Sequence, residues 1–554
     1  MLTSFPMRWI LWLLSALLLV SGFGLPLRGI DTSMLPKPDP WRWLAVQRIQ
    51  ALLARSTQDH PHPVRVLFYG QSIIQQEWWV LVAQELRAQF PQANLIIENR
   101  AIGSFDATCL IRTAEVDVYP FRPDLIVFHC YGPYSPSKDW ENLLRQFRTR
   151  TTADILLVGN HPLRDSEVTE TLDPAQMKVP SESWLNYVYT PALARELGLC
   201  LPDNRSAWKS YLQASQRPVG SLLRDGVHFN LEGSELQFAA LRPYLRTPRV
   251  VPELDPLNNE RIRTVGVGET GVRWKDRRLR LPFVGNRVDV IGGGGPSVSC
   301  QVRIDGMPPT LLMSGRGHRR TSLWKGEVYP WPALLRVGHE VPLNLETWVL
   351  RVTEVDPQHP EYFRFAVTGT VTGDDGVGVS TNRFRSRSGQ VCIDPEDWLR
   401  RFPKGYSQLD TLILWQTEDR AVDSFFTPGD DLLGEAYPVT LIQDLPDAPH
   451  VLELIAEGDG PLPPVAAIRV YHPQGSPWDT PRSDTGPPCL RVLVSSDEVL
   501  AVWPEKTAGW RLFRGGAATR MPWPVPDLLQ NGMGIKGARV PMETPLGLFR
   551  LENR

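Results

Sequence analysis

A serine lies where a buried strand is predicted to give way to a helix. Residues 64–69 form a short apolar run that ends at Gly70, a pattern typical of a buried strand, and Gln71 and Ser72 follow directly. At this position the Ser72 hydroxyl would face the carboxyl end of the strand and the amides that open a helix. A serine hydroxyl is hardly ionised at neutral pH and needs a base to act as a nucleophile. Ser72 is therefore a candidate nucleophile, with a helix N-cap as the alternative role.

A base for this nucleophile is found in the segment from Asp225 to Asn230, which contains His228. An aspartate three residues before a histidine can accept the imidazole Nδ1 proton, which leaves Nε2 to take a serine proton. Asp-Gly also forms ordinary turns, so this motif alone predicts little. The chain order Ser72, Asp225, His228 is nevertheless that of a hydrolase triad, although a Gly-x-Ser-x-Gly sequence is absent.

Strands and helices alternate between these two motifs. Apolar runs predict strands at residues 64–69, 94–98, 123–129 and 153–158 and a strand-like segment at 198–201, and helical periodicity predicts helices at 73–90, 139–150, 184–197 and 231–244. Such alternation predicts an α/β fold, with a parallel sheet and helices on both of its faces. Ligands of such a sheet bind at the carboxyl ends of the strands.

The region from Val64 to Leu245 resembles an SGNH (GDSL-type) hydrolase, a family of esterases with a flavodoxin-like three-layer α/β/α fold. The sequence Gly70-Gln71-Ser72 resembles the block that carries the nucleophile, and the segment from Asp225 to Gly233 closely resembles the final block. The resemblance implies that Ser72 attacks the ester, that His228 acts as base and then as acid, and that Asp225 orients the imidazole. It implies no metal and no organic cofactor.

The resemblance also implies an oxyanion hole with backbone amides of Ser72 and Gly103 as donors, because residues 99–104 resemble the second block of the family. The Gly-x-Asn-Asp pattern of the third block is missing. At its place, after strand 123–129, the chain has Tyr131 and Gly132, and an asparagine occurs one strand later, at Asn160. The third donor is therefore left open between Asn160, the loop at Gly132 with its tyrosine hydroxyls, and neither.

The pattern changes near residue 249, where short runs rich in Val, Leu, Arg and aromatic residues alternate with Gly and Pro clusters. Runs such as 287–291 and 347–353 alternate with period two, which predicts a β-sandwich or jelly roll. Residues 283–291 with 302–306 resemble the jelly-roll, galactose-binding-like modules appended to carbohydrate esterases. That resemblance implies an acylated carbohydrate as the substrate.

The N-terminal segment predicts export. Arg8 precedes an apolar run over residues 9–20, and small residues follow the run, as in a signal peptide. With its flanks the run approaches the roughly 20 residues that span a bilayer, so an uncleaved anchor also fits. No second stretch of this kind follows. We therefore expect a secreted, periplasmic or membrane-anchored protein outside the cytoplasm, in contact with a membrane only through this segment.

Composition excludes several classes of protein. Of the 554 residues, 42% are hydrophobic and 22% are charged, which excludes a disordered, collagenous or coiled-coil chain. The net charge of -2 provides no global positive field, so no nucleic-acid partner is predicted. The 6 cysteines include no Cys-x-x-Cys pair, and His129 and His161 are expected to line the site as polar residues, so no metal is predicted.

These observations combine into one organisation and three candidate functions. The expected segments are 1–27 (signal peptide or anchor), 28–62 (linker), 63–248 (SGNH hydrolase domain), 249–475 (β-sandwich jelly roll) and 476–554 (Pro-rich β tail, unassigned). The leading hypothesis is an exported serine esterase that removes acyl groups, in particular acetyl groups, from a carbohydrate. The alternatives are an O-acyltransferase with the same triad, and a glycan-binding surface protein with a degenerate hydrolase domain. The intact Ser72, Asp225 and His228 set favours an enzyme.

Overall fold

The structure is a computed structural model. It describes residues 29–38, 40–131, 138–170, 177, 181–246, 254–268, 272–325, 330–426 and 438–473, and seven strands between 491 and 553. The predicted signal or anchor segment and Gly132 lie outside the described residues. Within the described ranges, no helix is long and apolar enough to cross a bilayer.

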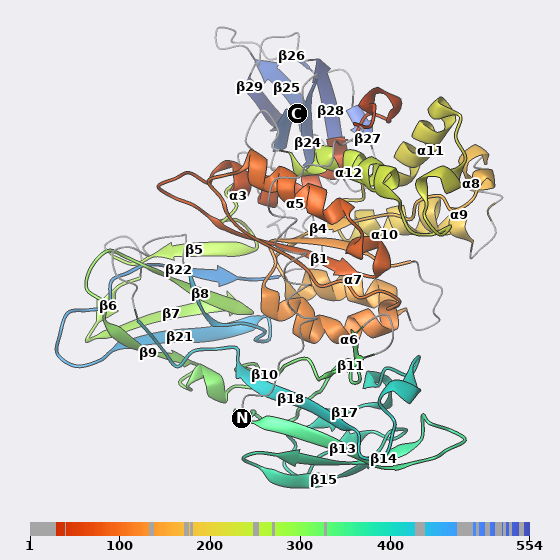
Figure 1. The fold of residues 1–554 in the computed structure, drawn as a ribbon. Coiled ribbons are helices and arrows are strands. Elements are labelled where there is room, and N and C mark those ends of the chain that lie inside the picture. The colour runs from red at the N-terminus through yellow and green to blue at the C-terminus, as the bar shows by residue number, and fades with distance from the viewer. Residues whose placement is uncertain are drawn as a thin grey trace, which may run out of the picture.

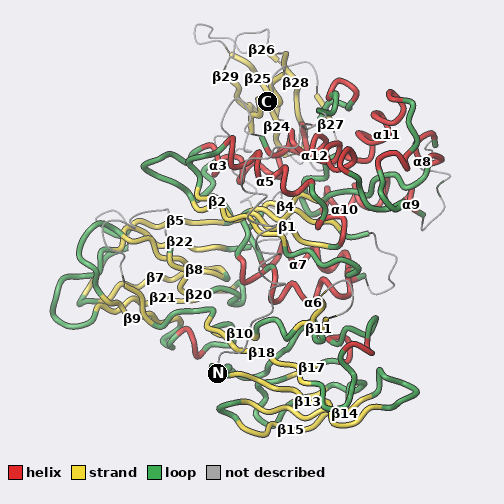
Figure 2. Tube along the Cα trace, in the orientation of Figure 1, coloured by secondary structure: helices red, strands yellow, loops and turns green. Residues whose placement is uncertain are grey.

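Four parallel strands form the first sheet, in the order β2-β1-β3-β4 (Figure 1, Figure 2). One more parallel bridge, between Leu156 and Cys200, lies where the strand-like segment 198–201 was predicted. The predicted parallel α/β region is therefore confirmed. Its strands are β1 (Pro63–Gly70), β2 (Asn94–Asn99), β3 (Leu125–His129) and β4 (Asp154–Leu157).

Helices cover both faces of this sheet (Figure 1). Side chains of β1 alternate between two cores: Val66 and Phe68 pack in one, and Leu67 and Tyr69 pack in the other. Because both faces are covered, the strands read as continuous apolar runs rather than as alternating patterns. One face carries α3 (Gln47–Ala54), α5 (Trp78–Gln89) and α12 (Leu231–Leu245), and the other carries α6 (Ala107–Asp117) and α7 (Asp139–Arg150).

The helix predicted over residues 73–90 is interrupted. It consists of α4 (Ser72–Gln75) and α5, because Gln76 has an extended backbone, with φ -75° and ψ 163°. The break keeps Ile74 and Trp78 buried on the same side, so the hydrophobic period does not reveal it. The helix predicted over 184–197 is likewise divided, into α9 (Glu182–Trp184), a π-helical turn (Leu185–Tyr189) and α10 (Thr190–Glu196); α8 (Asp165–Thr169) and α11 (Asn204–Ser215) complete this region.

Antiparallel sheets follow from residue 262, which confirms the predicted β-rich region; its jelly-roll topology stays a prediction. A five-stranded sheet in the order β19-β9-β21-β7-β6 and a four-stranded sheet in the order β20-β8-β22-β5 share one hydrophobic core. The strands are β5 (Ile262–Gly266), β6 (Trp274–Lys275), β7 (Arg278–Gly285), β8 (Arg287–Gly292), β9 (Ser299–Ile304), β19 (Ser424–Phe426), β20 (Val439–Ile442), β21 (Ala448–Ala456) and β22 (Val465–Tyr471).

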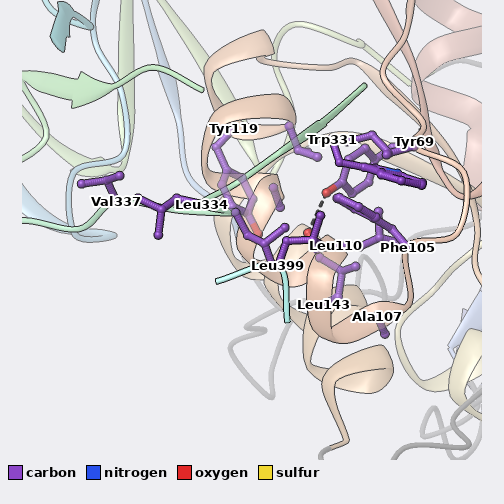
Figure 3. Close-up of a cluster of buried hydrophobic side chains, with 14 of the residues drawn as sticks. Tyr69, Phe105, Ala107, Leu110, Tyr119, Leu143, Trp331, Leu334, Val337 and Leu399 are labelled. Atoms are coloured by element: carbon purple, nitrogen blue, oxygen red, sulfur yellow. Dashed lines mark hydrogen bonds between the residues drawn. The ribbon is translucent and has the colours of Figure 1, made fainter. Parts of the chain in front are cut away.

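Residues 305–423, between β9 and β19, form a second set of strands that we call the inserted β unit. Its Trp331, Leu334 and Leu399 join the core beneath α6 and α7, and Trp331 lies beside Tyr69 and Phe105 (Figure 3). The predicted β-sandwich over residues 249–475 does not separate this unit, because both sets of strands share the same period-two pattern. Its strands are β10 (Arg316–His318), β11 (Leu323–Lys325), β12 (Pro330–Pro332), β13 (Thr347–Val355), β14 (Phe363–Gly369), β15 (Gly373–Val379), β16 (Phe384–Arg385), β17 (Cys392–Ile393) and β18 (Leu412–Asp419).

The C-terminal segment contains two further antiparallel sheets, in the orders β23-β24-β28-β27 and β26-β25-β29. The short strands agree with the pattern of the sequence here. The strands are β23 (Arg491–Val494), β24 (Glu498–Pro504), β25 (Trp510–Gly515), β26 (Trp523–Pro524), β27 (Leu528–Gln530), β28 (Ile535–Pro541) and β29 (Leu548–Asn553).

The conformation of Gly70 at the end of β1 leads to a prediction about the stability of the protein. Gly70 has a φ of +141°, and a Cβ at this position would lie 2.0 Å from the carbonyl oxygen of His129. Gly70→Ala must push β1 away from β3, so we expect the free energy of unfolding to fall by about 3 kcal/mol. Urea denaturation measures it. Gly220→Ala is the control, because nothing lies within 4 Å of an added Cβ there. A Gly70→Ala protein as stable as the control would show that the sheet tolerates the contact.

Candidate active site

The parallel sheet delivers the predicted site residues to one edge. Ser72 follows β1, Gly103 follows β2, Tyr131 follows β3 and Asn160 follows β4. The carboxyl ends of neighbouring parallel strands lie at the same edge, where such sheets bind ligands. The four residues therefore share that edge, while Gly132 lies outside the described part of the chain.

Ser72 is the first residue of α4, on a sharp turn at the end of β1. The turn depends on Gly70, and the backbone N–H of Gln71 donates to the carbonyl of His129 (3.2 Å). Gln71, not Ser72, occupies the N-cap position, and Ser72 is partly exposed while Ile73 beside it is buried. The side chain of Ser72 makes no hydrogen bond to the residues that the structure describes, so capping does not occupy it.

Side chains of the first turn fasten α4 to the neighbouring loops. With its amide oriented to suit both neighbours, Gln71 donates to the carbonyl of Phe105 (3.1 Å) and accepts from the N–H of Tyr131 (2.7 Å). Gln75 Nε2 donates to the carbonyl of Ala101 (2.9 Å). The loops that follow β2 and β3 are thereby held against the helix that begins with Ser72.

Asp225 and His228 form a closed turn. Oδ1 of Asp225 accepts the backbone N–H groups of Val227 (3.1 Å) and His228 (2.8 Å), and Oδ2 lies 2.7 Å from His228 Nδ1. The backbone N–H of His228 and then its ring lower the pKa of Asp225 to about 2, so the carboxylate stays ionised at neutral pH. An ionised carboxylate at Nδ1 favours the tautomer whose Nε2 can accept a proton.

Two contacts attach this turn to the segment that follows Ser72. Gln76 Oε1 accepts the backbone N–H of Phe229 (2.5 Å), and Arg224 lies 3.6 Å from Glu77. The break between α4 and α5 is therefore the place where the turn of His228 docks. No hydrogen bond joins Ser72 to His228 within the described ranges, and such contacts are often long in unliganded sites. The nucleophile–base pair stays a prediction.

Asn230 and Gly233 begin α12 just after His228. Asn230 Oδ1 accepts the N–H of Gly233 (3.0 Å), and its Nδ2 donates to the carbonyl of Ser221 (2.7 Å). A Cβ on Gly233 would lie 2.3 Å from the carbonyl oxygen of Leu222. These residues of the motif therefore anchor the turn of His228 between the preceding segment and α12.

The inserted β unit holds the loop that contains Gly103. Trp331 Nε1 donates to the carbonyl of Gly103 (3.2 Å), and Arg401 donates to the carbonyl of Ser104 (2.9 Å), whose φ is +68°. No sequence pattern reveals these contacts of Trp331 and Arg401, because the two residues are 228 and 297 residues away from their partners. The backbone N–H of Gly103 as an oxyanion donor stays a prediction.

Tyr131 contributes a buried hydroxyl that has no hydrogen-bond partner in the described part of the chain. Its ring packs edge-on against His129, with ring centroids 4.9 Å apart. Burial first, and then the negative charges of Glu182 and Asp225, raise the pKa of Tyr131. The hydroxyl therefore keeps its proton at neutral pH and is available as a donor.

Asn160 is held by hydrogen bonds to Glu182 and Arg205. Its Nδ2 donates to Glu182 (3.3 Å), and Arg205 donates to its backbone carbonyl (3.4 Å). Arg205 in turn pairs with Glu167 at 2.7 Å. The amide of Asn160 is therefore engaged by a carboxylate, unlike the hydroxyl of Tyr131.

His129 and His161 are both buried at this edge of the sheet. Burial lowers the pKa of His129 to about 4 and that of His161 to about 3, so both rings are neutral at pH 7. His161 Nε2 lies 2.9 Å from the carbonyl oxygen of Val227, which links it to the turn of His228. Among the described residues, no group of three or more His, Cys, Asp or Glu side chains is arranged to hold a metal ion.

These histidines predict a pH-dependent stability. Their folded pKa values lie below the unfolded value of 6.5, so their contribution is complete above pH 6.5 and falls as the pH drops toward 4. In this range each histidine lowers the free energy of unfolding by up to about 1.4 kcal/mol for every pH unit that the pH drops. Between pH 7.5 and 5.0, the free energy of unfolding of His129→Phe should fall by about 2 kcal/mol less than that of the parent. Urea denaturation at the two pH values measures this difference.

His359→Gln is the control for this experiment, since the His359 side chain is 57% exposed. It should retain the pH dependence of the parent. Identical pH dependence in the parent and His129→Phe would contradict the assignment of neutral, buried His129.

No protein-family model matches the chain, and no curated protein matches it. Among solved structures, similarity is found to a protein described as a GDSL-like lipase from Parabacteroides merdae (18% identity, 34% of this chain and 98% of that chain, TM-score 0.28). A two-domain esterase (CEX) active on acetylated mannans is 12% identical, and the match covers 80% of this chain and 100% of that chain with a TM-score of 0.31. Axe2, an acetylxylan esterase from Geobacillus stearothermophilus, is 19% identical, and the match covers 33% of this chain and 95% of that chain with a TM-score of 0.27. The structural neighbours are thus a GDSL-like lipase and carbohydrate esterases, at similarities too low to carry their activities to this chain.

Proposed function

We propose that this protein is an exported serine esterase that removes acyl groups, in particular acetyl groups, from a carbohydrate. The observation that carries the proposal is the 2.7 Å contact between Asp225 and His228 Nδ1, in a turn attached to the segment that follows Ser72. An oriented base beside a serine on a strand-to-helix turn is the arrangement that acyl transfer needs. The carbohydrate substrate and the export rest on the sequence patterns.

In the proposed reaction, Ser72 Oγ attacks the ester carbonyl while His228 Nε2 takes the hydroxyl proton. The tetrahedral intermediate collapses, His228 returns the proton to the sugar oxygen, and the sugar leaves with a free hydroxyl. Water then attacks the acyl-enzyme with His228 again as base, which releases the carboxylic acid and restores Ser72. Asp225 stays ionised throughout and stabilises the imidazolium.

The negative oxygen of the intermediate needs converging donors, each typically contributing about 10²–10³ in rate. We assign the backbone amides of Ser72 and Gly103 as two donors and the Tyr131 hydroxyl as the third. The protonated hydroxyl of Tyr131, which has no hydrogen-bond partner among the described residues, supports this choice over Asn160, whose amide donates to Glu182.

The nucleophile is tested with p-nitrophenyl acetate. Ser72→Ala should lower kcat by about 10³-fold or more, because no other group can form the acyl-enzyme. Ser215→Ala is the control, since Ser215 Oγ only donates to carbonyls of its own helix. Hydrolysis at equal rates by the parent and Ser72→Ala would contradict the esterase proposal. The remaining hypothesis would then be a glycan-binding protein with a degenerate hydrolase domain.

The third oxyanion donor is tested by comparing two variants. Tyr131→Phe should lower kcat by about 10²-fold with little change in KM, because the hydroxyl acts only in the transition state. Asn160→Ala should lower turnover less than Ser72→Ala and leave folding intact, because Glu182 keeps its contact with Asn186 (3.1 Å). Equal losses in Asn160→Ala and Ser72→Ala, with native thermal stability, would instead make Asn160 an essential donor.

A further inference from the structure

A cavity lies at the opposite edge of the parallel sheet from Ser72. It has a volume of about 420 Å³ and is lined by residues at the amino ends of the strands, among them Pro63, Asn94 and Asp124. Strands of the four-stranded sheet of the β-rich region close its other side, through residues such as Tyr471. Its volume lies within the range of small-molecule sites. The proposed esterase chemistry uses none of these residues.

Arginines dominate the lining. Three come from the α/β region and two come from the β-rich region, so the cavity lies between the two. They are Arg48, Arg65 and Arg122, and Arg287 and Arg469.

Carboxylates balance only some of this charge. Asp124, which also lines the cavity, pairs with Arg48 at 2.6 Å. Asp289 is fully buried and pairs with Arg287. Arg65 and Arg122 form no ion pair with a carboxylate of the described residues, which leaves a surplus of positive charge at these two positions.

The next layer of buried charge does not remove the surplus. Asp154 interacts with Arg48 and accepts the backbone N–H of Ile49 (2.8 Å). Buried Arg261 is the nearby cation that offsets Asp154. Asp154 is therefore already offset and, among the described residues, adds no ion pair to Arg65 or Arg122.

Arg122 differs from the other arginines of the cavity in its polar contacts. Its Nε is buried, and its side chain has no hydrogen bond or ion pair with the residues that the structure describes. Burial first, and then the positive charges of Arg287 and Arg65, lower the pKa of Arg122 to about 10, although the carboxylate of Asp289 acts in the opposite direction. A buried guanidinium beside like charges is costly unless an anion compensates it.

Arg65 also lacks a carboxylate partner within the described ranges. Its Nε donates to the carbonyl of Phe121 (2.6 Å), and its guanidinium lies over the Phe121 ring, 4.7 Å from the centroid. These contacts orient the guanidinium, and the carboxylates of Asp124 and Glu98 act on its charge without forming an ion pair with it.

We propose that this cavity binds a small oxyanion of the phosphate class that carries more than one negative charge. Guanidinium groups match phosphate oxygens with paired, charge-assisted hydrogen bonds, and they stay charged at every physiological pH. Since Arg65 and Arg122 come from the α/β region and Arg287 from the β-rich region, one ligand bridges the two. Binding therefore stabilises the association of these regions, independently of catalysis at Ser72.

The probes are inorganic phosphate and pyrophosphate, added to the whole protein at constant ionic strength with NaCl as the reference salt. We expect saturable binding by titration calorimetry and a rise in Tm that NaCl does not produce. Arg122→Gln should weaken pyrophosphate binding at least about tenfold, because it removes a charge-assisted partner. Without added anion, its Tm should equal or exceed that of the parent, because an unpaired buried charge is gone.

Arg351→Gln is the matched control, since its side chain is 60% exposed in the inserted β unit and does not line the cavity. It should bind pyrophosphate as the parent does. Arg65→Gln gives a second test if Arg122→Gln folds poorly. Glycerol 3-phosphate, compared with inorganic phosphate, distinguishes an organic phosphate ester from the free anion by which binds more tightly. Absence of binding by both phosphate and pyrophosphate, or unchanged affinity in Arg122→Gln and Arg65→Gln, would overturn the proposal.

Discussion

The approach of Gly70 to the carbonyl of His129 is the constraint on which the site depends. It lets β1 end in a sharp turn while it stays paired with β3, so the chain enters α4 with Ser72 at the edge of the sheet. The same carbonyl accepts the N–H of Gln71, whose side chain then binds the loops after β2 and β3. A side chain larger than hydrogen at position 70 would disturb each of these contacts, because they share one backbone turn.

The turn of His228 is a second rigid piece that docks on the first. Asp225 closes it from inside, Asn230 caps the helix that follows, and Gln76 receives it at the break between α4 and α5. Neutral, buried His161 supports it through the carbonyl of Val227. The position of His228 therefore rests on hydrogen bonds to backbone groups.

The β-rich half contributes to the α/β region at both edges of the sheet. At the edge of Ser72, Trp331 and Arg401 hold carbonyls of the loop that contains Gly103, and Trp331 also packs into the core (Figure 3). At the opposite edge, Arg287 lines the same cavity as Arg65 and Arg122. Burial keeps the histidines at one edge neutral and leaves the arginines at the other edge charged, because a guanidinium keeps its proton where an imidazole loses it.

The sequence by itself determined the parallel α/β region, its strands and the local pairing of Asp225 with His228. These features depend on short-range patterns: apolar runs, helical periods and a three-residue spacing. Only the tertiary structure decided the break at Gln76, the contacts of Trp331 and Arg401, the engagement of Asn160 by Glu182 and the gathering of arginines around one cavity. Those features arise where segments distant in the chain meet, and a pattern within one segment carries no information about which backbone group or charge will lie against it.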